Sequence, residues 1–76
     1  MSRGYSLHLQ LLNTRADPSN LGVRLGRACI ARDISVIQVS EAVGVTRQTV
    51  YNWFVGASSP HWRCADRVEQ FLNNLT

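Results

Sequence analysis

The sequence predicts an all-α domain of four to five short helices. Three observations support this. Apolar residues recur at helical spacing along most of the chain, Ser, Thr and Asp stand where such segments would begin, and Gly or Pro separates them. The chain has 76 residues, of which 45% are hydrophobic and 17% charged, a composition typical of one small globular domain. No apolar run approaches the ~20 residues of a membrane span.

The first residues are the least regular part of the pattern. We expect residues 1–16 to form an N-terminal arm, followed by the main domain at residues 17–76. From Tyr5 to Leu11 apolar and polar residues alternate as in a strand, yet this stretch has no β-branched residue and suits a helix equally well. We favour a short helix, and in either case we expect other residues to cover its four leucines, Leu7, Leu9, Leu11 and Leu12. The arm lacks the apolar core and cleavage site of a signal peptide, so we expect a cytoplasmic location.

The next segment is predicted to be a helix that begins near Asp17 and ends at Asp33. Asp17 is suited to cap it and Pro18 to occupy its first position, where no amide donor is needed. Its apolar residues share one face and its arginines lie elsewhere: Leu21, Leu25, Ala28 and Cys29 against Arg24, Arg27 and Arg32. Cys29 and Cys64 are far apart and form no CxxC pair, so we interpret both as small core residues rather than a disulfide.

Two short helices are predicted next, joined by a tight turn. Ser35 and Gln38 have the spacing of a capping box at the start of the first helix. Gly44 ends it, since a residue without a Cβ readily adopts the left-handed conformation of such a turn. Thr46 then caps the second helix, over residues 46–56. The inward-facing residues of the pair are predicted to be Val39, Val43, Val50, Trp53 and Phe54.

A last helix is predicted after the break GASSP. Ser59 is expected to cap it, with Pro60 in its first turn. Trp62, early in this helix, is expected to pack against the domain rather than to stack on a base. A long apolar stripe runs along the helix, formed by Cys64, Val68, Phe71, Leu72 and Leu75.

The stretch SVIQVSEAVGVTRQTVYNWFVG, followed shortly by a proline, resembles the helix-turn-helix of the lambdoid phage repressor and Cro family. The resemblance covers roughly residues 18–75. It rests on a small residue, a turn glycine, a capped second helix, a tryptophan and a closing Gly and Pro, namely Ser40, Gly44, Val45, Thr46, Val50, Trp53, Gly56 and Pro60. It implies a lambda-repressor-like DNA-binding domain whose second motif helix enters the major groove. The core of the motif would be Val39, Ser40, Gly44, Val50 and Trp53.

The resemblance assigns base contacts to one face of residues 46–56. They fall on Arg47, Gln48 and Asn52, with Tyr51 alongside. Arg is well matched to guanine, and Gln or Asn to adenine. The alternative is an ordinary solvated helix face, which the joint presence of the turn, the caps and the glycines disfavours. Phosphate contacts, which position a protein without specifying sequence, are implied at Thr46, Thr49, Ser58, Ser59, His61 and Arg63.

Two places depart from the family pattern. The family usually has a glutamine that touches the DNA backbone where this chain has Val36, followed by Ile37, so an exposed apolar pair would replace one phosphate contact. Many relatives bury an ion pair at the positions that are Cys29 and Phe54 here. Both partners are apolar together, which is consistent, because one unpaired buried charge would cost ~3–5 kcal/mol.

The sequence gives no support for an enzyme, a metal or a cofactor. His8 and His61 have no nucleophile pattern nearby, and no glycine-rich phosphate loop follows a strand. His61 and Cys64 are spaced like two ligands, but a structural zinc site needs four. All eight basic residues are arginine, and the formal net charge of +3 gives weak support to an anionic partner.

We therefore expect a small phage or bacterial transcription regulator, such as a Cro-like repressor, that binds double-stranded DNA. One motif reads too few base pairs for useful specificity, so we expect a homodimer. Its interface is expected on the C-terminal helix, with residues 5–12 as candidates to cross over. The alternative is a protein–protein module that binds a host protein such as RNA polymerase, motivated by Val36, Ile37 and the leucine-rich arm. The expected dimer interface is formed by Phe71, Leu72 and Leu75.

Overall fold

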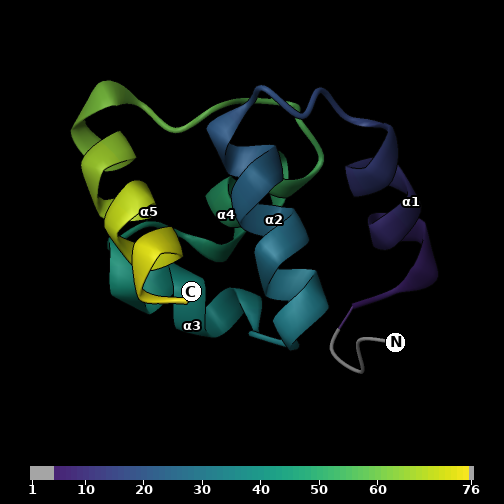
Figure 1. Cartoon of the computed structure of the whole chain (residues 1–76), viewed down its shortest axis with the longest axis horizontal. Coiled ribbons are helices and arrows are strands. Elements are labelled where there is room, and N and C mark those ends of the chain that lie inside the picture. The colour runs from purple at the N-terminus through teal and green to yellow at the C-terminus, as the bar shows by residue number, and fades with distance from the viewer. Residues whose placement is uncertain (1–4, 76) are drawn as a thin grey trace.

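The computed structural model describes residues 5–75, and this range forms five α-helices and no strand (Figure 1). The all-α class is confirmed, and the helical alternative for the N-terminal segment is the one observed. No helix within this range combines the length and the apolar composition that a membrane crossing requires. The helices are α1 (Leu7–Arg15), α2 (Leu21–Arg32), α3 (Val36–Val43), α4 (Arg47–Phe54) and α5 (Trp62–Asn74).

Helix α2 is the centre of the arrangement. It contacts α1, α4 and α5, while α3 packs against α4 and α5. In Figure 1, α2 lies in front of α4, with α1 on one side and α5 on the other. The core therefore forms where α2, α3, α4 and α5 face one another. Its fully or nearly fully buried apolar members are Tyr5, Val23, Leu25, Cys29, Val36, Val39, Val43, Val50, Trp53, Phe54 and Val68.

Two glycines of α2 bring α4 unusually close. A Cβ atom added at Gly22 would stand 2.5 Å from the Cβ of Trp53. One added at Gly26 would stand 2.9 Å from Cγ of Phe54. Both distances are far below van der Waals contact, so any larger residue would push α4 away in a closely packed interior. This close approach of α2 and α4 was not predicted from the sequence.

The predicted inward face of the two middle helices is confirmed. Val39, Val50 and Phe54 are completely buried, and Trp53 is 3% exposed. Cys29 lies in the same cluster as Phe54, so both positions of the expected apolar pair are in the core. Burial raises the pKa of the Cys29 thiol to about 12, against the opposing charge of Arg32.

The predicted start of the second helix is wrong by three residues. Asn20, not Asp17, is the N-cap, and its side-chain oxygen accepts a hydrogen bond from Gly22 N at 2.8 Å. Asp17 instead begins a turn, where its carboxylate accepts hydrogen bonds from the amide and hydroxyl of Ser19. These bonds lower the pKa of Asp17. Asp and Asn are equally good caps, and the side-chain bonds of Asp17 favour the turn here. The predicted end at Asp33 is confirmed by its left-handed φ of 56°.

The predicted start of the last helix is wrong by two residues. The backbone stays extended through His61, whose ψ is 152°. His61 Nδ1 therefore accepts the hydrogen bond from Arg63 N at 3.3 Å, and the Ser59 hydroxyl does not cap the helix. Pro60 consequently lies before the helix rather than in its first turn.

Helix α1 is attached differently from what its leucines predict. Leu7, Leu11 and Leu12 are 66%, 46% and 38% exposed. The expectation that other residues cover the four leucines of this segment is therefore wrong for three of them. The buried members are Tyr5 and, unexpectedly, Asn13. These three leucines therefore lie on the solvent side of α1, whose main helix contact is with α2.

Hydrogen bonds add to the packing of Tyr5 and Leu9 in holding α1. The Asn13 amide donates to the carbonyl of Val23 at 3.2 Å and to that of Phe54 at 2.7 Å. The Tyr5 hydroxyl donates to the carbonyl of Ile34, and its ring centroid lies 5.9 Å from that of Phe54. One buried amide thus joins α1 to both α2 and α4. Burial raises the pKa of Tyr5, with smaller contributions from neighbouring groups that carry negative charge when ionised.

Candidate nucleic-acid interface

Helix α3 begins and ends as its sequence predicts. The Ser35 hydroxyl accepts from Gln38 N, and the Gln38 side chain accepts from Ser35 N, each at 3.1 Å, which completes the capping box. At the other end Gly44 has a φ of 83°, a left-handed conformation. Arg67 of α5 donates to the carbonyl of Val43 at 3.2 Å and so satisfies one of the last carbonyls of α3. The turn between α3 and α4 is therefore stabilised by the conformation of Gly44 and by the hydrogen bond from Arg67.

Helix α4 is fixed at its start by Thr46. The Thr46 hydroxyl accepts a hydrogen bond from Thr49 N at 3.2 Å and lies 2.9 Å from the Thr49 hydroxyl. Since Val50 and Trp53 are buried on the opposite face, the rotation of α4 about its axis is determined. The orientation of its outer side chains follows from this.

The outer face of α4 presents three hydrogen-bonding side chains and a phenol ring. Arg47, Gln48 and Tyr51 are exposed, and Asn52 is half-buried. Gln48 Nε2 donates to Asn52 Oδ1 at 3.1 Å, so the two amides one turn apart are already aligned. The structure thus brings together all four residues to which the resemblance assigns base contacts. A guanidinium beside paired amides can form two-bond contacts with the edges of purine bases.

Polar side chains surround this face on two sides. Thr46 and Thr49 lie at the start of α4, and the backbone carbonyl of Ser58 is tied to α2 by a 3.2 Å hydrogen bond from the Asn20 amide. The expected phosphate contacts therefore come from two places, the N-terminus of α4 and the segment between α4 and the first turn of α5. All except the half-buried Thr49 are exposed: Thr46, Ser58, Ser59, His61 and Arg63.

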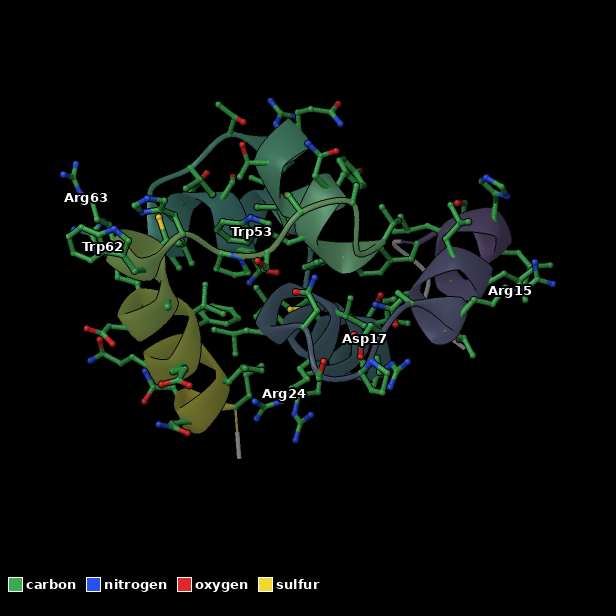
Figure 2. All side chains as sticks on the ribbon, turned by 90° about the horizontal axis from the view of Figure 1, so that it is seen from above. Arg15, Asp17, Arg24, Trp53, Trp62 and Arg63 are labelled. Atoms are coloured by element: carbon green, nitrogen blue, oxygen red, sulfur yellow. The ribbon has the colours of Figure 1, made fainter. Side chains whose placement is uncertain are left out.

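Trp62 is the largest departure from the expected site. It is 72% exposed, so the prediction that it packs against the domain is wrong. The guanidinium carbon of Arg63 lies 5.1 Å from the indole centroid, and the His61 ring lies 5.4 Å from it. Figure 2 shows Trp62 and Arg63 projecting from the outer end of α5, whereas Trp53 lies inside. Helical periodicity could have revealed this, because Trp62 is about 120° around the helix from the buried Val68.

The apolar stripe of α5 is largely used within the domain. Val68 is fully buried, while Phe71 and Leu72 are partly buried and pack against the core. Leu75, the third residue of the expected dimer interface, is also half-buried. Besides Trp62, the most exposed large apolar side chain in the described range is Leu7 of α1.

The expected apolar pair of α3 is divided between the interior and the surface. Val36 is only 6% exposed and belongs to the core, so its expected exposure is wrong. Ile37, 48% exposed, remains on the surface in the first turn of α3. The pair therefore contributes one apolar side chain to the core and one to the surface.

The outer face of α4, with its polar surroundings, is the strongest candidate site in residues 5–75. Within this range no three His, Cys, Asp or Glu side chains gather so as to hold a metal ion, and Cys29 and Cys64 are free thiols. A scan against protein-family models finds no matching family, and searches of curated proteins and of solved structures find no similar chain. The candidate function therefore rests on the chemistry of the residues themselves.

Proposed function

We propose that this chain binds double-stranded DNA in a sequence-specific manner, with α3, the Gly44 turn and α4 acting as a helix-turn-helix. One observation carries the proposal. Arg47 and Gln48, both exposed, and the half-buried Asn52 share the outer face of a helix whose rotation is fixed by its buried face and its cap. A major groove ~12 Å wide admits one such helix, and its base edges offer partners to these side chains.

The side chains on this face have different roles in the proposed DNA contact. Arg47, at the first helical position, donates two hydrogen bonds to a guanine. Gln48 and Asn52 already share one hydrogen bond, so they read an adenine as a pair, with the amide of one orienting the other. Tyr51, 41% exposed, places a ring and a hydroxyl at the edge of the same face.

The surrounding hydroxyls and Arg63 contact phosphate. Threonine and serine hydroxyls contact phosphate without reading sequence, and an arginine adds charge that makes the affinity depend on salt. The indole of Trp62, with Arg63 stacked on it, adds an exposed donor and an apolar plate at the same edge. We assign this plate to packing against the deoxyribose backbone, since a duplex leaves no unstacked base for it.

The biological role that fits such a domain is that of a small, cytoplasmic transcription regulator of the phage repressor and Cro type. A homodimer would place two copies of α4 in successive major grooves ~34 Å apart. Phe71, Leu72 and Leu75 remain the proposed interface, and the exposed Leu7, Leu11 and Leu12 are the competing one. Leu72→Asp and Leu7→Asp distinguish the two surfaces, because only the variant in the true interface dissociates the dimer in sedimentation on a palindromic duplex.

The decisive experiment is a binding selection from random duplex DNA at moderate salt. The expected result is enrichment of one short motif by the native chain and loss of part of that motif with Arg47→Ala. Arg15→Ala is the matched control, since it removes the same charge from an exposed residue that projects outward from α1 (Figure 2). A selection that returns no motif with the native protein would refute sequence-specific binding.

One observation favours a second candidate, a module that binds a host protein such as RNA polymerase. Ile37 and Trp62 are large apolar residues that remain on the surface, and such residues form the centres of protein interfaces. The salt dependence of DNA retention separates the candidates. Binding through several phosphates weakens steeply between 50 and 200 mM salt, by about 10³–10⁵ for six to ten contacts. A protein-only module would show no retention at either salt concentration.

A further inference from the structure

A basic groove lies between α2 and α5, apart from the outer face of α4. It is a groove of about 340 Å³, and no acidic residue lines it. Arg24, Arg27 and Arg32 border it from α2. Ala28, Leu72 and Leu75 supply its apolar floor. The DNA proposal makes no use of any of these arginines.

The three arginines form a row along α2 rather than a cluster at one position. Arg24 and Arg32 are eight positions apart in α2, which is about 12 Å along the helix axis. A single small anion would reach one or two of them, whereas a chain segment with several carboxylates would reach all three. Beside the row lie Asn73 and the apolar floor, and the floor is best covered by apolar side chains from the same segment.

Two of the arginines are held in place by backbone carbonyls. Arg32 Nε donates to the carbonyl of Leu75 at 3.1 Å. A terminal nitrogen of Arg27 donates to the carbonyls of Thr14 and Ala16 at 3.1 and 3.3 Å. A guanidinium has five donors, so these bonds orient the groups without exhausting them. Binding to side chains that are already ordered costs less conformational entropy.

The side chain of Arg24 has no comparable hydrogen bond to a helix end. It is exposed, and its guanidinium makes no hydrogen bond with any residue in the described range. In Figure 2 it projects from the side of α2 that faces away from α4. A helix stabilised only by its core would not require a third arginine next to two that already bind helix ends.

We propose that the groove between α2 and α5 binds an acidic, amphipathic segment of a partner protein. The carboxylates of that segment pair with the arginine row, and its apolar side chains rest on Leu72, Leu75 and Ala28. The groove shares Leu72 and Leu75 with the proposed dimer interface, so the segment and a second copy are alternatives at this surface. A second copy would bring its own three arginines to the same place, and charge complementarity therefore favours the acidic segment here. It is also favoured over nucleic acid, whose phosphates and sugars would leave the leucine floor unused. Because the groove faces away from α4, a bound segment leaves the outer face of α4 open.

The test uses a fluorescently labelled synthetic peptide of about three helical turns with leucine and glutamate at helical spacing. A second peptide replaces every glutamate by glutamine. Fluorescence anisotropy with the full chain should show saturable binding of the acidic peptide only. Arg24→Glu should weaken that binding by about tenfold or more, since it reverses one charge of the row. Arg15→Glu, the same change on α1, should leave it within about twofold, and circular dichroism verifies that both variants stay helical.

Three outcomes would overturn the proposal. The glutamine peptide binds as well as the acidic one, Arg24→Glu leaves peptide binding intact, or Arg24→Glu weakens duplex DNA binding while the acidic peptide does not bind at all. The third outcome would assign the groove to nucleic acid. Leu75→Ala adds an independent check, because loss of the apolar floor should weaken the acidic peptide severalfold without any change in charge.

Discussion

Helices α1 and α4 have nearly the same length, but they are attached to the domain in opposite ways. α4 buries Val50, Trp53 and Phe54 and turns its polar side chains outward. α1 turns most of its leucines outward and is held by Tyr5 and a buried Asn13. The difference shows that apolar periodicity predicts the orientation of a helix only when apolar packing is what holds it. Where hydrogen bonds between distant residues do so, the pattern of leucines misleads.

If packing holds α4, truncation of its largest buried side chain should have the largest effect on stability. Trp53→Ala is expected to lower the free energy of unfolding by ~3–5 kcal/mol, because it removes a large buried side chain beside Gly22 and leaves a cavity. This is a large fraction of the stability of a domain of this size. Chemical denaturation measures it, and Leu11→Ala on α1 is the control, expected to change stability by less than ~0.5 kcal/mol. Equal losses in the two variants would contradict the comparison.

If hydrogen bonds hold α1, loss of one amide should matter more than loss of a leucine. Asn13→Ala is expected to lower the free energy of unfolding by about 2–3 kcal/mol, since the carbonyls of Val23 and Phe54 lose a buried donor. A thermal scan would show this as a fall in the midpoint of about 4–8 °C per kcal/mol. An effect no larger than that of Leu11→Ala would mean that α1 is not held by its amide.

The outer face of α4 should affect binding without affecting stability. Arg47→Ala is expected to weaken binding to a selected duplex by ~1–3 kcal/mol and to relax specificity at one base pair. Arg63→Ala should weaken selected and random duplexes alike, because it removes a phosphate contact. Competition binding with both duplexes separates the two results. The base-reading assignment fails if Arg47→Ala also weakens both duplexes to the same degree.

The smallest expected effect concerns alkaline pH and the attachment of α1. The pKa of Tyr5 is raised in the folded chain above its ordinary value of 10, chiefly by burial. The neutral phenol is therefore favoured by folding, so its contribution to stability is present below pH 10 and is lost as the pH rises through the folded pKa. Denaturation at pH 8 and pH 11 should show a fall for the native chain and a smaller fall for Tyr5→Phe. Identical falls would exclude Tyr5 as the group responsible.

Local signals in the chain were sufficient to place α3, its turn and the start of α4. The capping box at Ser35, the left-handed Gly44 and the Thr46 cap all involve residues within a few positions of one another. The same holds for the outer face of α4, since Arg47 to Asn52 are brought together by the helical period alone. Where two local signals competed, local reasoning was weaker. Asp17 and Ser59 are good caps, yet Asn20 and His61 take that role.

Other features depend on contacts between residues far apart in the chain. Asn13 is buried because its amide reaches Val23 and Phe54, and nothing in the neighbouring sequence signals those partners. Gly22 and Gly26 are explained only by the approach of α4. The arginine groove likewise exists only because α5 lies against α2 and sets Leu72 and Leu75 beside the arginine row. Periodicity describes one helix at a time, whereas a groove, a close crossing or a buried amide is a property of two helices together.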